Sequence, residues 1–161
     1  MPLIIDRQPV AEDSWIRVSS AEGLEQSGDL LLDWALWQSH GEALKARGGR
    51  CGVVIDGEVE LDDLAPHLAD LDLVAVAFPS FADGRGFSQA RLLRQRYGFA
   101  GQIRAVGDVT WDRLRFMARC GFNAFEVPAE RYSDAMLRAF DEITVSYQGA
   151  EDDPRPLYRQ Q

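Results

Sequence analysis

The run Leu73-Val74-Ala75-Val76-Ala77-Phe78 leads directly into Pro79-Ser80-Phe81-Ala82-Asp83-Gly84-Arg85-Gly86-Phe87. The first six residues are apolar without polar–apolar alternation, which is typical of a strand that is covered on both faces in a parallel sheet. The glycines after it mark a turn, and the apolar spacing beyond the turn indicates a helix that ends at Gly98. This stretch therefore predicts one strand–helix unit of an α/β protein.

The same order of strand and helix recurs along the chain. Further strands are predicted at 51–55, 102–106 and 123–127, and 143–147 is a candidate for one more. Helices are predicted after them, at 61–71, around 114–118 and at 135–140. Four consecutive units predict a parallel sheet with right-handed crossovers, either as an open α/β sheet or as a partial, half TIM-barrel-like arrangement.

The residues before position 51 do not show the same alternation of strand and helix. Residues 30–37 are too apolar to stand in water and continue into an apolar segment that Gly48 and Gly49 close, so we expect a largely buried helix there. Residues 1–28 are expected to form a loose strand or an N-terminal arm before the core of a single α/β domain that spans 1–148. The remaining 149–161 are expected to be a polar C-terminal tail. With 161 residues, the chain is too short for a complete eight-unit barrel of roughly 250 residues.

Charge is distributed unevenly. The net charge of −9 argues against a nucleic-acid or anionic-membrane binder, because neutralising phosphates needs a basic face. Residues 84–121 nevertheless contain eight arginines and two aspartates, a net charge of +6, which leaves −15 for the rest. Arg91, Arg94 and Arg115 from this segment are candidates for binding an acidic partner, although helix arginines are also often simply solvated.

The sequence gives little support for a membrane segment, a disulfide or a metal site. No basic leader precedes an apolar segment at the N-terminus, and no apolar run approaches the ~20 residues of a membrane span, so we expect a cytoplasmic protein with no membrane partner. Cys51 and Cys120 are isolated and are interpreted as reduced thiols. His40 and His67 lie far apart without a cysteine cluster, so no metal site is predicted.

The loops at the carboxyl ends of parallel strands share one rim, where α/β proteins carry their sites. At this rim Gly84, Arg85, Gly86 and Ser88 open a helix, and free N–H groups beside an arginine would suit a small oxyanion. The alternative is that these residues have only a structural role, as a glycine turn with a stabilising arginine–aspartate pair. Asp83 and Asp108 each follow a predicted strand and are candidates for acid–base catalysis, with helix N-capping as the alternative role for both.

No cofactor is specified by a clear motif. The segment 84–89 resembles a dinucleotide-binding turn, but Gln89 stands where the third glycine belongs, and no acidic residue closes a strand about 20 positions later. A phosphate-binding loop with the G-x-x-x-x-G-K-[ST] pattern is absent. The cofactor is therefore unknown.

Residues 78–94, with 98–99, 104–109 and 119–126, resemble a bacterial family of unknown function. The resemblance is strongest over 51–127. The family is described as an oxidoreductase involved in sulfite reduction, because its genes lie beside that of a haem sulfite reductase. The resemblance implies a role in assimilatory sulfur metabolism.

Two hypotheses follow from this resemblance. The first is an enzyme, or a subunit of one, whose rim binds sulfite or another oxyanion. Because the sequence has no cysteine set for an iron–sulfur cluster or sirohaem, such an enzyme would have to borrow its electron carrier. The second is a non-catalytic accessory protein that docks on sulfite reductase or its electron donor. The edges of a partial barrel also need cover, which suggests a homodimer.

Overall fold

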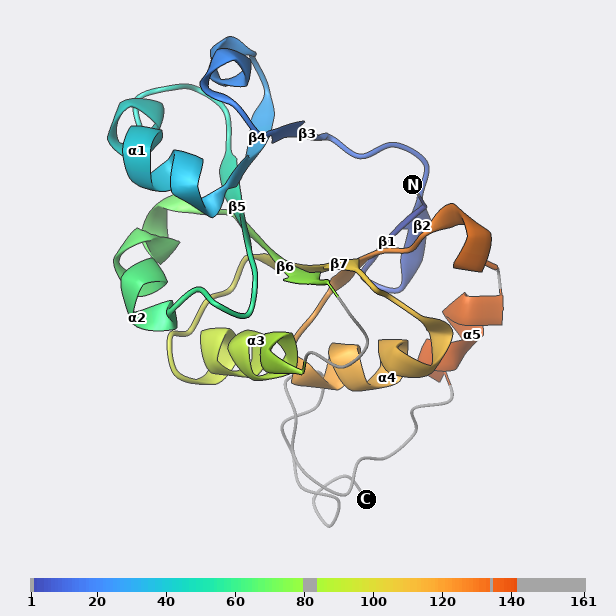
Figure 1. Ribbon diagram of the computed structural model, residues 1–161. Coiled ribbons are helices and arrows are strands. Elements are labelled where there is room, and N and C mark those ends of the chain that lie inside the picture. The colour runs from blue at the N-terminus through green and yellow to red at the C-terminus, as the bar shows by residue number, and fades with distance from the viewer. Residues whose placement is uncertain (1, 80–83, 134, 142–161) are drawn as a thin grey trace.

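The computed structural model describes residues 2–79, 84–133 and 135–141, and its centre is one curled sheet of eight strands in the order β2-β1-β8-β7-β6-β5-β4-β3. Strands β3 to β8 pair in parallel, whereas β1 is antiparallel to both β8 and β2. Figure 1 shows that the sheet curls into a half-barrel, so the predicted α/β class is confirmed in its half-barrel form. The strands are β1 (Leu3–Ile5), β2 (Gln8–Val10), β3 (Trp15–Val18), β4 (Asp29–Asp33), β5 (Cys51–Ile55), β6 (Leu73–Phe78), β7 (Gln102–Gly107) and β8 (Ala124–Glu126).

Helices cover the convex face of the sheet (Figure 1). They are α1 (Trp34–Leu44), α2 (Leu61–Leu64), α3 (Arg85–Gln95), α4 (Trp111–Cys120) and α5 (Ala135–Asp141), with 3-10 turns η1 (Ala21–Glu25), η2 (Ala65–Asp70) and η3 (Ala129–Arg131). None of the helices among the described residues is long and apolar enough to cross a bilayer.

The alternation of side chains along β6 shows why its sequence lacks polar positions. Val74, Val76 and Phe78 belong to the main core under the helices. Leu73 and Ala75 point to the opposite, concave side, where they cluster with Trp15 and Leu31 and are fully buried. Because both faces are covered, every position of the strand favours an apolar residue, as the sequence indicated.

The helix expected over residues 30–37 is a correction. Leu30, Leu31 and Leu32 form β4, which pairs in parallel with β3 and β5, and the helix begins only at Trp34. A central strand with both faces buried is as apolar as a buried helix, so the run did not distinguish the two. The helix expected over 61–71 is also shorter: α2 ends at Leu64, and Pro66 lies at the start of the 3-10 turn η2.

Residues 1–28, expected as a loose strand or an arm, contribute three strands, β1, β2 and β3, to the sheet. Ile4 pairs with Phe125 of β8, and its side chain is fully buried. Trp15 pairs with Asp29 and packs in the concave cluster. The connector between β2 and β3 crosses the open side of the half-barrel (Figure 1). The strand proposed at 143–147 and the tail at 149–161 lie outside the described residues.

Two glycines fix the rim beside β6. Gly107 ends β7 with φ +94, and a Cβ there would collide with the carbonyl oxygen of Phe78 on the neighbouring strand. The N–H of Asp108 donates to that same oxygen at 2.8 Å. Gly86 is buried, and a Cβ on it would lie 2.6 Å from the Phe78 ring, so α3 can approach β6 this closely only with glycine at this position.

Candidate functional site

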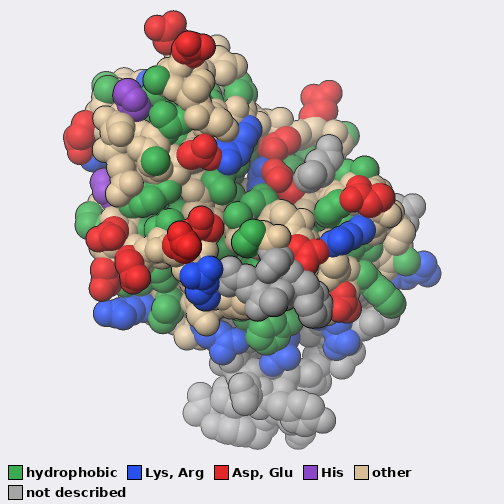
Figure 2. All heavy atoms as spheres, in the orientation of Figure 1, with side chains coloured by type: hydrophobic (Ala, Val, Ile, Leu, Met, Phe, Trp, Pro, Cys, Tyr) green, Lys and Arg blue, Asp and Glu red, His purple; other side chains and the backbone are tan. Residues whose placement is uncertain are grey.

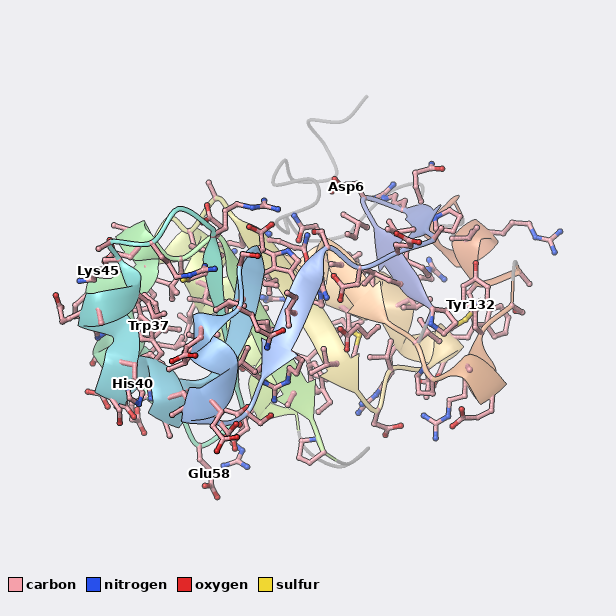
Figure 3. The ribbon with its side chains drawn as sticks, turned by 90° about the horizontal axis from the view of Figure 1, so that it is seen from above. Asp6, Trp37, His40, Lys45, Glu58 and Tyr132 are labelled. Carbon is pink, nitrogen blue, oxygen red and sulfur yellow. The ribbon has the colours of Figure 1, made fainter. Side chains whose placement is uncertain are left out.

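The carboxyl ends of β4 to β7 lie on one edge of the half-barrel, as parallel pairing requires. In the view from above, Glu58, which follows β5, lies at this edge, and Asp6 lies at the opposite one (Figure 3). After β6, the next described residue beyond Pro79 is Gly84, which is the N-cap of α3. Asp83, the first predicted catalytic residue, lies outside the described residues.

The predicted anion-binding residues occupy the first turn of α3, but they do not have equivalent environments. Gly84, Arg85 and Ser88 are exposed, whereas Gly86 is buried against β6 and presents no surface. The Arg85 side chain lies against Gly57 in the loop after β5, where an added Cβ would come within 2.5 Å of its Nε. Arg85 is therefore packed against the acidic loop that joins β5 to α2.

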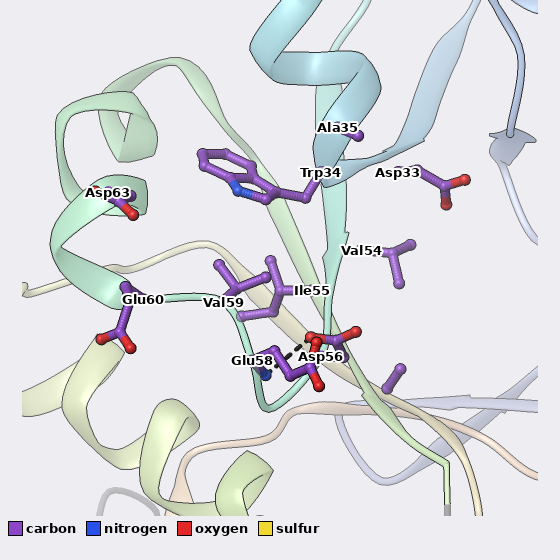
Figure 4. Close-up of a pocket in the computed structure, with 11 residues that line it drawn as sticks. Asp33, Trp34, Ala35, Val54, Ile55, Asp56, Glu58, Val59, Glu60 and Asp63 are labelled. Carbon is purple, nitrogen blue, oxygen red and sulfur yellow. Dashed lines mark hydrogen bonds between the residues drawn. The ribbon is translucent and has the colours of Figure 1, made fainter.

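The pocket at this rim is acidic. It has a volume of about 470 Å³, and its lining includes five carboxylates and the indole of Trp34, over an apolar base that includes Val54 and Ile55. Figure 4 shows Trp34 facing Val59, with Asp56 and Glu58 at the other end of the pocket. The carboxylates are Asp33, Asp56, Glu58, Glu60 and Asp63. Their charge would repel an oxyanion from this part of the rim.

Asp108 is held by two arginines. Its carboxylate is 2.5 Å from Nη1 of Arg131, which lies in η3 after β8, and 3.9 Å from Nη1 of Arg113 on α4. This hydrogen bond to Asp108 raises the pKa of Arg131 above its ordinary value. Arg113 also donates to the Asp108 backbone oxygen and lies over the rings of Phe78 and Phe87. The rim thus gathers two cations and one carboxylate beside α4.

The N-cap alternative for Asp108 does not apply. Thr110, two residues later, is the N-cap of α4, and no side chain forms the cap hydrogen bond. The carboxylate of Asp108 instead forms ion pairs with Arg113 and Arg131. Its proposed catalytic role stays a prediction.

The three arginines predicted to bind a partner differ in how they are used. Arg115 is exposed on α4. Arg91 is half-buried and donates to the sulfur of Cys120 at 3.7 Å. Arg94 is half-buried and donates to three backbone carbonyls, those of Gly121 (3.0 Å), Phe99 and Gly101 (both 2.8 Å). Arg91 and Arg94 therefore join α3 to α4 and to the loop before β7.

We expect Arg94→Met to lower the free energy of unfolding by about 2 kcal/mol, because it leaves three carbonyls without a charged donor. Urea unfolding followed by circular dichroism measures this loss. Arg96→Met is the matched control: Arg96 is exposed at the end of α3, over the Tyr97 ring, and we expect a loss below about 1 kcal/mol. An equal loss in both variants would contradict this structural role of Arg94.

An exposed aromatic surface lies on α4. Trp111 is 54% exposed and Phe116 is 46% exposed, and the exposed Arg115 lies one helical turn after Trp111 and next to Phe116 in the sequence. The Phe116 ring packs against Phe87 at 4.9 Å between ring centroids, and Phe87 in turn packs against the buried Phe78 at 5.0 Å. Figure 2 shows Lys and Arg side chains over α3 and α4 in the lower part of the molecule. We call Trp111, Arg115 and Phe116 the α4 surface.

The described residues contain no group of three His, Cys, Asp or Glu side chains placed to hold a metal ion. Gln89, at the position of the missing third glycine, is buried and donates its amide to the backbone oxygens of Asp56 and Val59. It thus ties α3 to the loop after β5. Burial raises the pKa of the Cys51 thiol, which disfavours its reactive thiolate form.

Sequence analysis missed two features of charge. Arg131 was not singled out, although its position just after β8 would have placed it at the rim. The second feature is Arg104 on β7, which is fully buried on the concave side and binds Asp13 and Glu126. Arginine within an otherwise apolar strand was the only signal for it.

A half-barrel with charged and aromatic side chains along the carboxyl ends of its strands places the chain among α/β proteins of the TIM-barrel-like kind. Residues 52–158 match the family described as "Bacterial protein of unknown function (DUF934)", and the chain belongs to this family. Membership of a bacterial family of unknown function is thus confirmed. The match begins in β5, so β1 to β4 precede it. No curated protein matches the chain.

Proposed function

We propose that the protein is a cytoplasmic, non-catalytic accessory protein of assimilatory sulfite reduction. In this proposal the α4 surface binds sulfite reductase or its electron donor. The observation that carries the docking role is the exposure of Trp111 and Phe116 beside Arg115. The choice of partner rests on the sequence resemblance of residues 78–94 and the other segments named above.

The composition of the α4 surface suits a binding site. Tryptophan, other aromatic residues and arginine are enriched at protein interfaces and dominate their energetic centres. The Phe116 ring is supported by Phe87, which rests on the buried Phe78, so it is held in place before a partner arrives. A preorganised anchor loses little conformational entropy on binding. The exposed Arg115 of this surface favours an acidic partner.

We expect Trp111→Ala and Phe116→Ala each to weaken binding to purified sulfite reductase holoenzyme, or to its electron donor, by about tenfold. Biolayer interferometry measures both dissociation constants. Arg115→Glu is expected to slow association and to reduce its salt dependence. Leu92→Ala on α3, which is also exposed at 39%, is the matched control and should bind as the wild type does. The docking proposal fails if the wild type binds neither protein, or if the Trp111→Ala and Phe116→Ala variants bind unchanged.

The second candidate is an enzyme of sulfite reduction whose rim binds an oxyanion. It is favoured by one observation: Arg113 and Arg131 already hold one anionic group, the Asp108 carboxylate, at the carboxyl end of β7. In this candidate Gly84, Arg85 and Ser88 bind sulfite, and Asp83 and Asp108 transfer protons. The nearby acidic pocket weighs against it. Growth on sulfate that persists at the wild-type rate in Asp83→Asn and Asp108→Asn strains would rule it out.

A further inference from the structure

A buried arginine lies in the interior of the half-barrel. The side chain of Arg104 on β7 has no exposed surface. Its guanidinium donates to both carboxylate oxygens of Asp13, at 2.7 and 3.3 Å, and to Glu126 at 3.0 Å, and its Nε donates to Gln102 at 2.9 Å. Two nitrogens facing two oxygens of one carboxylate is the strongest geometry that arginine offers to an anion.

Asp13 reaches this arginine from a surface segment. It belongs to the connector 11–14, whose four residues are all exposed and which crosses the open side of the half-barrel (Figure 1). The Asp13 side chain is 34% exposed, so solvent reaches this member of the pair although Arg104 itself is covered. Its Oδ1 also accepts the N–H of Trp15 at 3.1 Å, which ties the connector to the start of β3. One carboxylate thus joins the barrel interior to the solvent-facing connector.

The two carboxylates at Arg104 have different positions. Glu126 is part of β8 and is fixed by the sheet, whereas Asp13 is held in place from a connector that lies outside any strand. A buried guanidinium needs one counter-charge, and Glu126 supplies it even when Asp13 is absent. The position of Asp13 can therefore be filled by another oxyanion of similar size without leaving the arginine uncompensated.

We propose that Arg104 is an anion-binding centre in the half-barrel, and that Asp13 is an internal ligand that a small oxyanion, such as a carboxylate or sulfite, displaces. Displacement releases the connector 11–14 from the concave side. The site is separate from the α4 surface, which lies on the convex side, and from the rim at the first turn of α3 (Figure 1). It does not depend on either proposed function.

Hydrogen–deuterium exchange of the wild-type chain is the first test. Sodium acetate, sodium sulfite and sodium chloride are compared at equal ionic strength. We expect acetate or sulfite, but not chloride, to speed exchange of amides in peptides covering residues 11–18 by at least threefold. Exchange of peptides covering 84–95 and 108–120 stays unchanged, whereas binding at the rim would alter those peptides instead. Identical exchange over 11–18 in all three salts overturns the proposal.

Asp13→Ala provides the second test because it removes the internal competitor. Isothermal titration should then show at least tenfold tighter binding of acetate or sulfite than in the wild type. Glu12→Ala, a neighbouring exposed carboxylate of the same connector, should bind as the wild type does. Arg104→Lys in the Asp13→Ala background should abolish the gain, since lysine lacks the planar fork. If a folded Asp13→Ala protein binds neither anion more tightly, the displacement model is wrong.

Discussion

Arg104→Met is expected to lower the free energy of unfolding by about 3 kcal/mol, because removing one partner of a buried ion pair leaves the others uncompensated. Asp13 and Glu126 would then face each other without a cation, inside a half-barrel where Arg104 has no exposed surface. Both carboxylates are partly exposed, which places the loss at the lower end of the range for buried pairs. Urea unfolding measured by tryptophan fluorescence and by circular dichroism reports the loss.

Arg17→Met is the matched control for this change. Arg17 pairs with Asp33, but both side chains are more than 40% exposed, so we expect the control to lose less than about 1 kcal/mol. Added salt should weaken the Arg17 pair and have little effect on the buried one. Comparable losses in the two variants would show that the interior network contributes no more than a surface ion pair.

Gly107→Ala has the second large expected effect. The residue has φ +94, a conformation that strains alanine, and its Cβ would collide with the carbonyl oxygen of Phe78 on β6. Because the collision is with backbone of a central strand, no side-chain rotation relieves it. We expect a loss of about 3 kcal/mol in the free energy of unfolding, measured by urea unfolding.

Gly48→Ala controls for the loss of glycine itself. Gly48 has open space around it and does not have a positive φ, so alanine there should change the stability by no more than about 0.5 kcal/mol. In Gly107→Ala, the displaced backbone would also move Asp108 away from Arg131. A stable Gly107→Ala protein with wild-type unfolding would mean that the β6–β7 contact adjusts more easily than its geometry indicates.

The half-barrel could be predicted from the sequence where strands and helices alternate clearly. Residues 73–78 are apolar at every position because both faces of β6 are buried, and the glycine turn that follows them marks the end of the strand. Residues 30–37 have a similar composition, but β4 ends at Asp33 and α1 begins at the next residue, Trp34. Periodicity does not separate buried strands from buried helices in such short runs.

The charged sites depended on contacts between distant parts of the chain. The rim was predictable because parallel strands bring their carboxyl ends to one edge. The acidic pocket was not expected, since Trp34 and Asp63 approach Asp56 only after α1 and α2 have packed on the sheet. The Asp13–Arg104 pair joins residues 91 positions apart, and local sequence carries no signal for such a contact. The sequence showed that arginines cluster in residues 84–121. It did not show which of them bind other parts of the chain and which are exposed.

The pairing of β1 with β8 affects when the protein can fold during synthesis. The first strand, Leu3–Ile5, has as its antiparallel neighbour the last strand of the described sheet, Ala124–Glu126. A ribosome must therefore deliver nearly the whole domain before β1 and Arg104's partner Asp13 can take their places. Such long-range closure slows folding and favours a single, late, cooperative step. Until then, β1 has only its antiparallel pairing with β2, and the edge of β1 that later pairs with β8 stays open.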